Sequence, residues 1–175
     1  MTTTSADIRV ARPDDAAAIT TIHDLAWRNA YRGIIPGITL ERMIARRGES
    51  WWNFNIRRGG AVLVLEVCGT VAGYISVGRA RARTAGLDGE VYELYLHPHY
   101  QGLGFGKKLL SAGFALLRRN NLNRIGIRVL ADNDAAVAFY RACGGRVVAH
   151  QPEKVGDKTL YVSVYGFDQL EDRAA

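Results

Sequence analysis

A glycine-rich segment near the middle of the chain constrains the fold more than any other feature. It follows an apolar stretch, residues 90–96, and leads into a long amphipathic stretch, residues 104–121. Gly102, Gly104 and Gly106 alternate there with larger residues. Glycine adopts backbone conformations, and permits close approaches, that a Cβ atom resists. The pattern therefore predicts a strand that turns sharply into a helix.

This turn has a chemical consequence where the following helix begins. The N–H groups of a first helical turn lack partners within the helix, and the helix dipole favours an anion beside them. Lys107 and Lys108 follow the glycines, and the whole chain carries a formal net charge of +6. The segment therefore predicts a phosphate-binding turn. The alternative is a tight turn that holds no ligand.

Two common phosphate motifs do not fit the segment. A P-loop needs glycine at the position of Gln101 and serine or threonine at the position of Lys108. The dinucleotide fingerprint needs Gly-x-Gly-x-x-Gly and an acidic residue about 20 positions later. Here the glycines are spaced Gly-x-Gly-x-Gly, and residues 125–127 read Ile-Gly-Ile. Both nucleotide-binding classes are therefore disfavoured.

The rest of the pattern predicts one mixed α/β domain over residues 1–175, in which helices come first. Polar tails are expected at residues 1–5 and 171–175, a loop at 29–37 and a polar turn at 152–158. Helices are expected from Arg12 onward, around 40–44, around 51–54, and at 104–121 and 135–142. Strands are expected at 8–10, 61–67, 71–77, 90–96, 125–130, 146–150 and 160–165.

The composition argues against a membrane or secreted protein. The most apolar run, residues 61–65, is closed by Glu66 and is far shorter than the roughly 20 residues that a bilayer requires. Residues 1–6 do not show a basic stretch followed by an apolar one, so no secretory signal is expected. We therefore expect a cytoplasmic protein that does not associate with a membrane.

Metal and nucleic-acid binding are also not expected. Cys68 and Cys143 form neither a disulfide framework nor a metal-binding spacing. The densest basic cluster, Arg79, Arg81 and Arg83, alternates with small residues before a glycine-containing segment. This pattern is typical of a solvated hairpin tip and not of a nucleic-acid surface.

The glycine segment resembles motif A of the GNAT superfamily of N-acetyltransferases, Gln/Arg-x-x-Gly-x-Gly/Ala. It reads Gln101-Gly102-Leu103-Gly104-Phe105-Gly106. The next motif of the family, a strand, an asparagine and a helix that ends in a tyrosine, is matched around Asn133 and Tyr140. Upstream, Glu90-Val-Tyr-Glu-Leu94-Tyr95-Leu96 is similar to the Glu-x-x-x-Leu-Tyr-Val of its fourth strand.

The resemblance implies an α/β (α+β) fold. Its sheet would be mixed and mostly antiparallel, with six to seven strands flanked by helices and a splay between the fourth and fifth strands. It also implies an enzyme that moves an acetyl group from acetyl-CoA to a primary amine of a small molecule or peptide by direct attack. The alternatives are a non-catalytic acyl-CoA-binding sensor of the same fold and a protein that binds another nucleotide. A homodimer stays open, and no metal is implied.

The resemblance also assigns residues to the cofactor. The pyrophosphate would lie on the backbone amides of residues 103–107, and the pantetheine arm would pair with residues 94–96 like an added strand. Asn133 would hydrogen-bond the arm, although a plain N-cap role explains it equally well. The implied cofactor-binding residues are Leu94, Tyr95, Leu96, Gln101, Gly102, Leu103, Gly104, Phe105, Gly106, Lys107, Asn133 and Tyr140.

Direct attack needs a base, because an amine with a pKa of about 10.4 is mostly protonated at neutral pH. Glu90, 11 residues before Gln101, is the first candidate from the resemblance. Glu93 is the rival, on the opposite face of a regular strand unless a β-bulge changes its direction. Tyr140 matches the general acid of the family, which protonates the departing thiolate. A backbone N–H near Leu96 would meet the oxyanion.

The sequence leaves the acceptor open among a peptide N-terminus, a polyamine, an aminoglycoside and an amino acid. In this family the N-terminal helices usually wall the acceptor site. Trp27, Tyr31, Trp51 and Trp52 could form an aromatic wall there, which would suit an apolar or cationic group. They could equally be core aromatics.

Overall fold

The computed structural model describes residues 5–81 and 86–167, which form two compact units. The first unit contains the described residues up to Val77 together with Glu93–Gly113, and the second contains the remaining ones. The boundaries fall inside β3 (Thr70–Arg79), β4 (Gly89–Leu96) and α4 (Phe105–Arg119). Each unit is described by itself below.

In the first unit the strands follow the order β1 (Ala6–Val10), β2 (Ala61–Val67), β3 and β4. The pairs β1–β2 and β2–β3 are antiparallel. The β2–β3 hairpin closes through Cys68 and Gly69, with φ angles of 48° and 78°. Positive φ at both central residues is the signature of a type I′ turn, whose twist matches that of the strands. The expected hairpin with Gly69 in its turn is therefore present.

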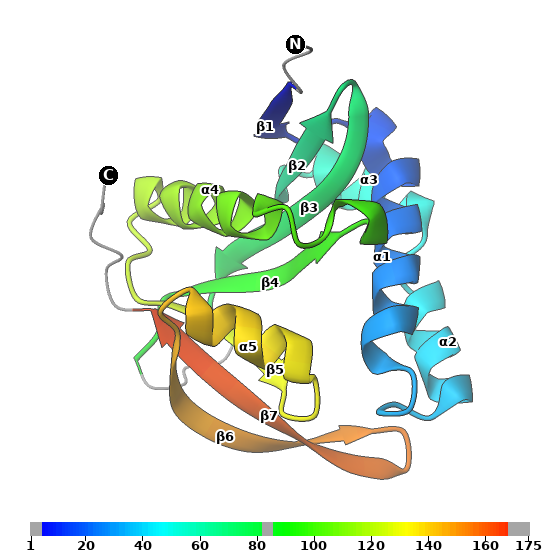
Figure 1. Ribbon diagram of the computed structural model, residues 1–175, viewed down its shortest axis with the longest axis vertical. Helices are drawn as coiled ribbons and strands as arrows, with labels where there is room; N and C mark the ends of the chain where they lie inside the picture. Colours follow the sequence, from blue (N-terminus) through cyan, green and yellow to red (C-terminus); the bar gives the residue numbers. More distant parts are fainter. Residues whose placement is uncertain (1–4, 82–85, 168–175) are drawn as a thin grey trace. The chain divides into compact units, whose positions relative to one another are not determined.

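Three helices pack in this unit, α1 (Ala16–Tyr31), α2 (Gly37–Ala45) and α3 (Glu49–Arg57). Both α2 and α3 contact α1 (Figure 1). Apolar residues recur on one face of α1, so the helix buries Ile19 and Ile22 against a core that includes Trp52, Val64 and Tyr74. A short 3₁₀ helix, Pro13–Asp15, leads into α1.

In the second unit the strands follow the order β4, β5 (Ile125–Leu130), β7 (Lys158–Phe167) and β6 (Arg146–Val155). The β5–β7 and β6–β7 pairs are antiparallel. The β4–β5 pair is parallel and covers three residue pairs, from Gly89↔Ile125 to Val91↔Ile127. Helix α5 (Asp134–Ala142) lies over these strands (Figure 1). A mixed, mostly antiparallel sheet of seven strands with flanking helices confirms the expected fold class.

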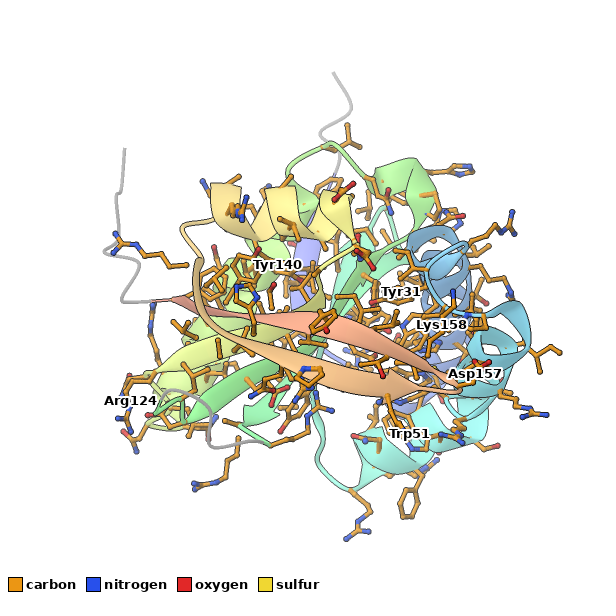
Figure 2. All side chains as sticks on the ribbon, turned by 90° about the horizontal axis from the view of Figure 1, so that it is seen from below. Tyr31, Trp51, Arg124, Tyr140, Asp157 and Lys158 are labelled. Carbon is orange, nitrogen blue, oxygen red and sulfur yellow. The ribbon has the colours of Figure 1, made fainter. Side chains whose placement is uncertain are left out.

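The expected polar turn at residues 152–158 is wrong. Strand β6 continues through Pro152 to Val155, β7 begins at Lys158, and the turn consists of Gly156 and Asp157. Proline has no N–H to donate to a neighbouring strand. Because β6 is the outermost strand, one of its edges has no neighbouring strand to bond, so proline is tolerated there. Figure 2 shows Asp157 and Lys158 at the tip of this hairpin, at the opposite end of the unit from Arg124.

The expected loop at residues 29–37 is shorter than predicted. Helix α1 continues to Tyr31, and α2 begins at Gly37. Gly33, with φ of 84°, takes the backbone through the left-handed region between them.

Some expectations concern residues outside the described ranges. They are Arg83 of the basic cluster and the polar tails, of which only Ser5 is described. Within the described ranges, no helix combines the length and the apolar character that a membrane crossing requires.

Candidate active site

The glycine turn of the first unit leads directly into α4. Gly102 and Gly104 have φ angles of 75° and 80°, and a Cβ atom built on either one would meet no atom within 4 Å. The first helical bond runs from the N–H of Lys108 to the carbonyl of Gly104, at 3.3 Å. The N–H groups of Phe105, Gly106 and Lys107 therefore precede the first helical bond and have no acceptor within the helix.

Gln101 fixes the turn to the end of β4. Its Nε2 donates to the carbonyl of Leu96 at 3.2 Å. The N–H of His97 donates to the carbonyl of Ala72 on β3 at 2.8 Å. Because backbone polar groups alternate in direction along a strand, the N–H of Leu96 is directed away from β3. On the side away from β3 the carbonyl of Leu96 accepts Gln101, and the N–H of Leu96 is the group that a ligand could bind.

These features fit the pyrophosphate of coenzyme A. The turn presents open space over two left-handed glycines, and helix amides favour an anion at this point. Lys107 and Lys108 are exposed in the first turn of α4. A cation there opposes the helix dipole, and a bound anion would relieve the conflict.

Glu93, on β4 in the same unit, is a buried carboxylate with two partners. Its side chain is 5% exposed. One oxygen pairs with Nη1 of Arg47, and the other accepts the hydroxyl of Tyr74 at 2.9 Å. Burial raises the pKa of Tyr74, and the carboxylate of Glu93 raises it further, so this hydroxyl keeps its proton. Both oxygens of Glu93 are thus engaged within the protein.

An aromatic cluster surrounds this pair. The ring of His23 on α1 lies 4.8 Å from that of Trp27, 6.2 Å from that of Trp52 and 6.5 Å from that of Tyr95. His23 and Trp52 are fully buried, whereas Trp27 and Tyr95 are half-buried. We call His23, Trp27, Tyr31, Trp52 and Tyr95 the α1 cluster. It extends from the interior of the unit to its surface.

Three side-chain nitrogens of the α1 cluster lack partners. Within the described residues, the buried atoms without a hydrogen bond are Nε2 of His23 and Nε1 of Trp27 and of Trp52. Buried polar groups are almost always paired, with protein or with ordered water. Nitrogens left unpaired in a single cluster indicate that a polar group from outside the chain, a water or a ligand, completes it.

The surface side of the cluster is polar as well. The hydroxyls of Tyr31 and Tyr95 lie 3.1 Å apart, and the ring of Tyr31 meets that of Trp27 edge-on at 5.2 Å. Of the aromatics expected as wall or core, Trp52 is a core residue, and Trp51 on α3 is 37% exposed. Figure 2 labels Tyr31 and Trp51.

Glu90 lies in the second unit and is also 5% exposed. It accepts the backbone N–H of Arg81 at 2.9 Å and pairs with Nη2 of the same residue at 2.7 Å. A regular strand would place residues 90 and 93 on opposite faces, yet both carboxylates are buried. Burial therefore does not rank the two candidate bases.

Asn133 and Tyr140 also lie in the second unit, on α5. Asn133 is the N-cap of this helix, and its Oδ1 accepts the N–H of Ala136 at 3.2 Å. Tyr140, labelled in Figure 2, is 5% exposed. Its ring meets those of Phe139 and Phe167. The capping oxygen of Asn133 leaves its amide nitrogen able to donate to a ligand.

Sequence reasoning missed two residues of the first unit, His23 and Arg47. The spacing of His23, Trp27 and Tyr31, each four positions apart, was a signal for one helical stripe. Nothing local connects Arg47 to Glu93, 46 positions away. Within the described ranges, no three His, Cys, Asp or Glu side chains are placed to share a metal ion.

Comparison with known proteins identifies relatives of this chain. The model of the acetyltransferase (GNAT) family matches residues 22–144. The L-methionine sulfoximine/L-methionine sulfone acetyltransferase of Salmonella typhimurium is 31% identical over 83% of both chains. The L-amino acid N-acyltransferase MnaT of Escherichia coli is 31% identical over 86% of this chain and 85% of its own.

Solved structures agree with the family match. The structure of YncA from Salmonella typhimurium with its cofactor acetyl-CoA aligns with a TM-score of 0.66 at 29% identity, over 97% of this chain and 96% of that one. The PaiA N-acetyltransferase of Thermoplasma acidophilum, in complex with coenzyme A, shares the fold, with a TM-score of 0.75 at 20% identity over 93% and 99% of the chains. The chain belongs to the GNAT family of acetyltransferases and is an N-acetyltransferase that uses acetyl-CoA.

Proposed function

We propose that this enzyme transfers the acetyl group to a primary amine of a small molecule or peptide by direct attack on the thioester. The observation that carries the proposal is that the first unit contains three structural features together. They are a glycine turn that leads into the N-terminus of α4, a backbone N–H of Leu96 directed away from β3, and a buried carboxylate beside aromatic side chains. The named relatives that act on amino acids and their derivatives support a small amine acceptor.

For the cofactor, we propose that the amides of residues 103–107 hold the pyrophosphate. The N–H of Leu96 would stabilise the oxyanion that forms at the acetyl carbonyl, because it is directed away from β3. Leu94, Tyr95 and Leu96 would hold the pantetheine arm, to which Asn133 would donate through its amide nitrogen. Bound in this way, acetyl-CoA supplies an activated thioester.

The acceptor must lose a proton before it attacks, and we propose a β4 carboxylate as the base. Glu90 is the first candidate and Glu93 the second. Each accepts hydrogen bonds from an arginine, Arg81 and Arg47 respectively, so each would act through water or after its arginine moves aside. Glu93 has the additional support that it lies in the same unit as the glycine turn.

The thiolate that leaves needs a proton, and we propose Tyr140 as its donor. A phenol has an ordinary pKa of about 10 and a coenzyme thiol resembles a cysteine thiol of about 8.5, so transfer to a forming thiolate needs assistance from the site. The packing of Tyr140 against Phe139 and Phe167 holds its ring in place.

The test is an amine panel with detection of free thiol. Purified protein with acetyl-CoA should release coenzyme A only when a suitable amine is added, and mass spectrometry should find the acetylated amine. Binding of acetyl-CoA without release above the background rate for every amine would contradict the proposal. It would then favour a non-catalytic acyl-CoA sensor.

Two further expectations stand as proposals. Residues 1–175 would act as one N-acetyltransferase domain, the protein would act in the cytoplasm, and a homodimer stays open. Sedimentation analysis tests the assembly, and a mass that corresponds to one chain at micromolar concentration would contradict a homodimer.

A further inference from the structure

Arg47 lies in the connection between α2 and α3, with its guanidinium between a buried acid and a tryptophan. Nη1 pairs with Glu93, and the guanidinium carbon lies 4.5 Å from the centroid of the Trp51 ring. The side chain of Arg47 is 28% exposed, whereas that of Glu93 is 5% exposed. Arg47 therefore joins a buried carboxylate to the surface of the unit.

The guanidinium has donors to spare. An arginine carries five N–H groups in a planar fork, and the described hydrogen bonds of Arg47 use one of its nitrogens. This fork matches a carboxylate in a bidentate geometry, which makes arginine the preferred residue for such recognition. Arg47 can thus hold Glu93 and a second carboxylate at the same time.

The α1 cluster adjoins this ion pair, because the ring of Trp52 lies 5.0 Å from that of Tyr74, whose hydroxyl donates to Glu93 at 2.9 Å. His23 interacts electrostatically with both Glu93 and Arg47. Its Nε2 and the indole nitrogens of Trp27 and Trp52 are the buried atoms without partners. This second, independent observation supports a polar ligand in this part of the unit.

We propose that the acceptor is an α-amino acid whose carboxylate binds Arg47 and whose ammonium is drawn to Glu93. A carboxylate and an ammonium on one carbon complement a guanidinium and a carboxylate that are themselves paired. This inference rests on the proposed function and names its substrate class. It sets aside a polyamine, an aminoglycoside and a peptide N-terminus, because none of them carries a carboxylate beside the reacting amine.

The reaction balances with this acceptor. The ammonium gives one proton to the base, and the free amine attacks the acetyl carbon. The new N–C bond forms, the C–S bond breaks, and the nitrogen loses a second proton. One proton ends on the thiol of coenzyme A and the other in solvent, while the carboxylate on Arg47 keeps its charge throughout.

The experiment compares each amino acid with its decarboxylated amine. L-leucine, L-methionine and L-phenylalanine are assayed beside 3-methylbutylamine, 3-(methylthio)propylamine and phenethylamine, with free-thiol detection. For at least one pair, wild-type kcat/KM should favour the amino acid by about tenfold or more. Arg47→Gln should raise KM for that amino acid by about 10–100-fold, since a charge-assisted pair is lost. The ratio of amino acid to amine should fall by the same factor.

Matched variants separate recognition from folding. Arg46→Gln removes the same charge from the neighbouring exposed residue and should leave the ratio unchanged. Arg47→Lys keeps a cation beside Glu93 but loses the fork, so the ratio should fall part of the way. The Arg47→Gln/Glu93→Gln double variant leaves no unpaired buried charge. Acetyl-CoA affinity and Tm are measured for every variant.

The outcomes distinguish failure of this inference from failure of the proposed acetylation of amines. If wild type favours the amino acid by less than about tenfold in every pair, or if Arg47→Gln lowers kcat/KM equally for both members, the inference is overturned while amine acetylation stands. If wild type acetylates no amine at all, the proposed function fails as well.

Discussion

Nδ1 of His23 lies 3.1 Å from Oδ1 of its neighbour Asp24. A carboxylate only accepts, so Nδ1 carries the proton and donates it, and Nε2 carries the lone pair. Burial lowers the pKa of His23, although the carboxylates of Glu93 and Asp24 oppose that shift. The imidazole is therefore neutral at physiological pH, and its tautomer is fixed by a residue on its own helix.

This arrangement predicts how stability depends on pH. With the pKa of His23 lowered on folding, the unfolded chain binds one more proton than the native state once the pH falls below the unfolded pKa of about 6.5. The stability due to neutral His23 is thus complete above about pH 6.5 and is lost as the pH falls toward the native pKa. Its slope is at most about 1.4 kcal/mol per pH unit.

Urea unfolding between pH 5 and 7.5 measures this slope. His23→Gln should flatten the dependence below pH 6.5, whereas His99→Gln, an exposed histidine in the loop after β4, should leave it as in wild type. The same slope in His23→Gln and wild type would show that another group accounts for the dependence.

Gly104→Glu should abolish cofactor binding. The change places a side chain and a negative charge in the open space over the turn, where the pyrophosphate is proposed to lie, and we expect the Kd for acetyl-CoA to rise at least about 100-fold. Calorimetry measures this. Gly59→Glu is the control, because Gly59 has a φ of 82° and equally open space but follows α3. It carries the same backbone strain of roughly 1–2 kcal/mol and should bind normally.

Tyr140→Phe should lower kcat by about 10²–10⁴-fold with little change in cofactor affinity, because only the proton donor of the thiolate is removed. The ring contacts with Phe139 and Phe167 are kept. Steady-state kinetics beside acetyl-CoA titration gives both numbers. Tyr161→Phe, on the exposed face of β7, is the control. Full activity of Tyr140→Phe would mean that the thiolate takes its proton from water.

Glu90→Gln should reduce the rate most at neutral pH, and the deficit should shrink as rising pH deprotonates the acceptor amine. It should also be smaller for acceptors whose amine has a low pKa. pH–rate profiles of Glu90→Gln and Glu93→Gln, side by side, decide between the two carboxylates. A Glu90→Gln profile parallel to that of wild type, with a pH-dependent loss in Glu93→Gln, would transfer the role to Glu93.

The glycine turn was predictable from sequence because its signals are local. Gly102 and Gly104 need a left-handed backbone, and the helix that follows shows its own periodicity. The β2–β3 hairpin was predictable for the same reason. Pro152 misled the prediction, because whether a strand tolerates proline depends on its being at an edge, which only the order of strands reveals.

The candidate site was predictable only in part. Glu90 and Glu93 were found by their place in a motif, but their partners Arg81 and Arg47 were not. The pairing of Arg47 with Glu93 depends on how α2, α3 and β4 pack, and no local pattern encodes that contact. The unpaired nitrogens of the α1 cluster are likewise a property of packing and not of composition.

All three tryptophans of the chain, Trp27, Trp51 and Trp52, belong to the first unit. Trp51 lies under the guanidinium of Arg47 and meets Trp52 edge-on at 4.9 Å, while Trp27 faces His23. Tryptophan fluorescence of this protein therefore comes from the surroundings of Arg47 and of the α1 cluster, and the second unit does not contribute at excitation wavelengths of 295 nm or longer. An amino acid that binds Arg47 would be seen directly by the emission of the native enzyme, without a label and without turnover.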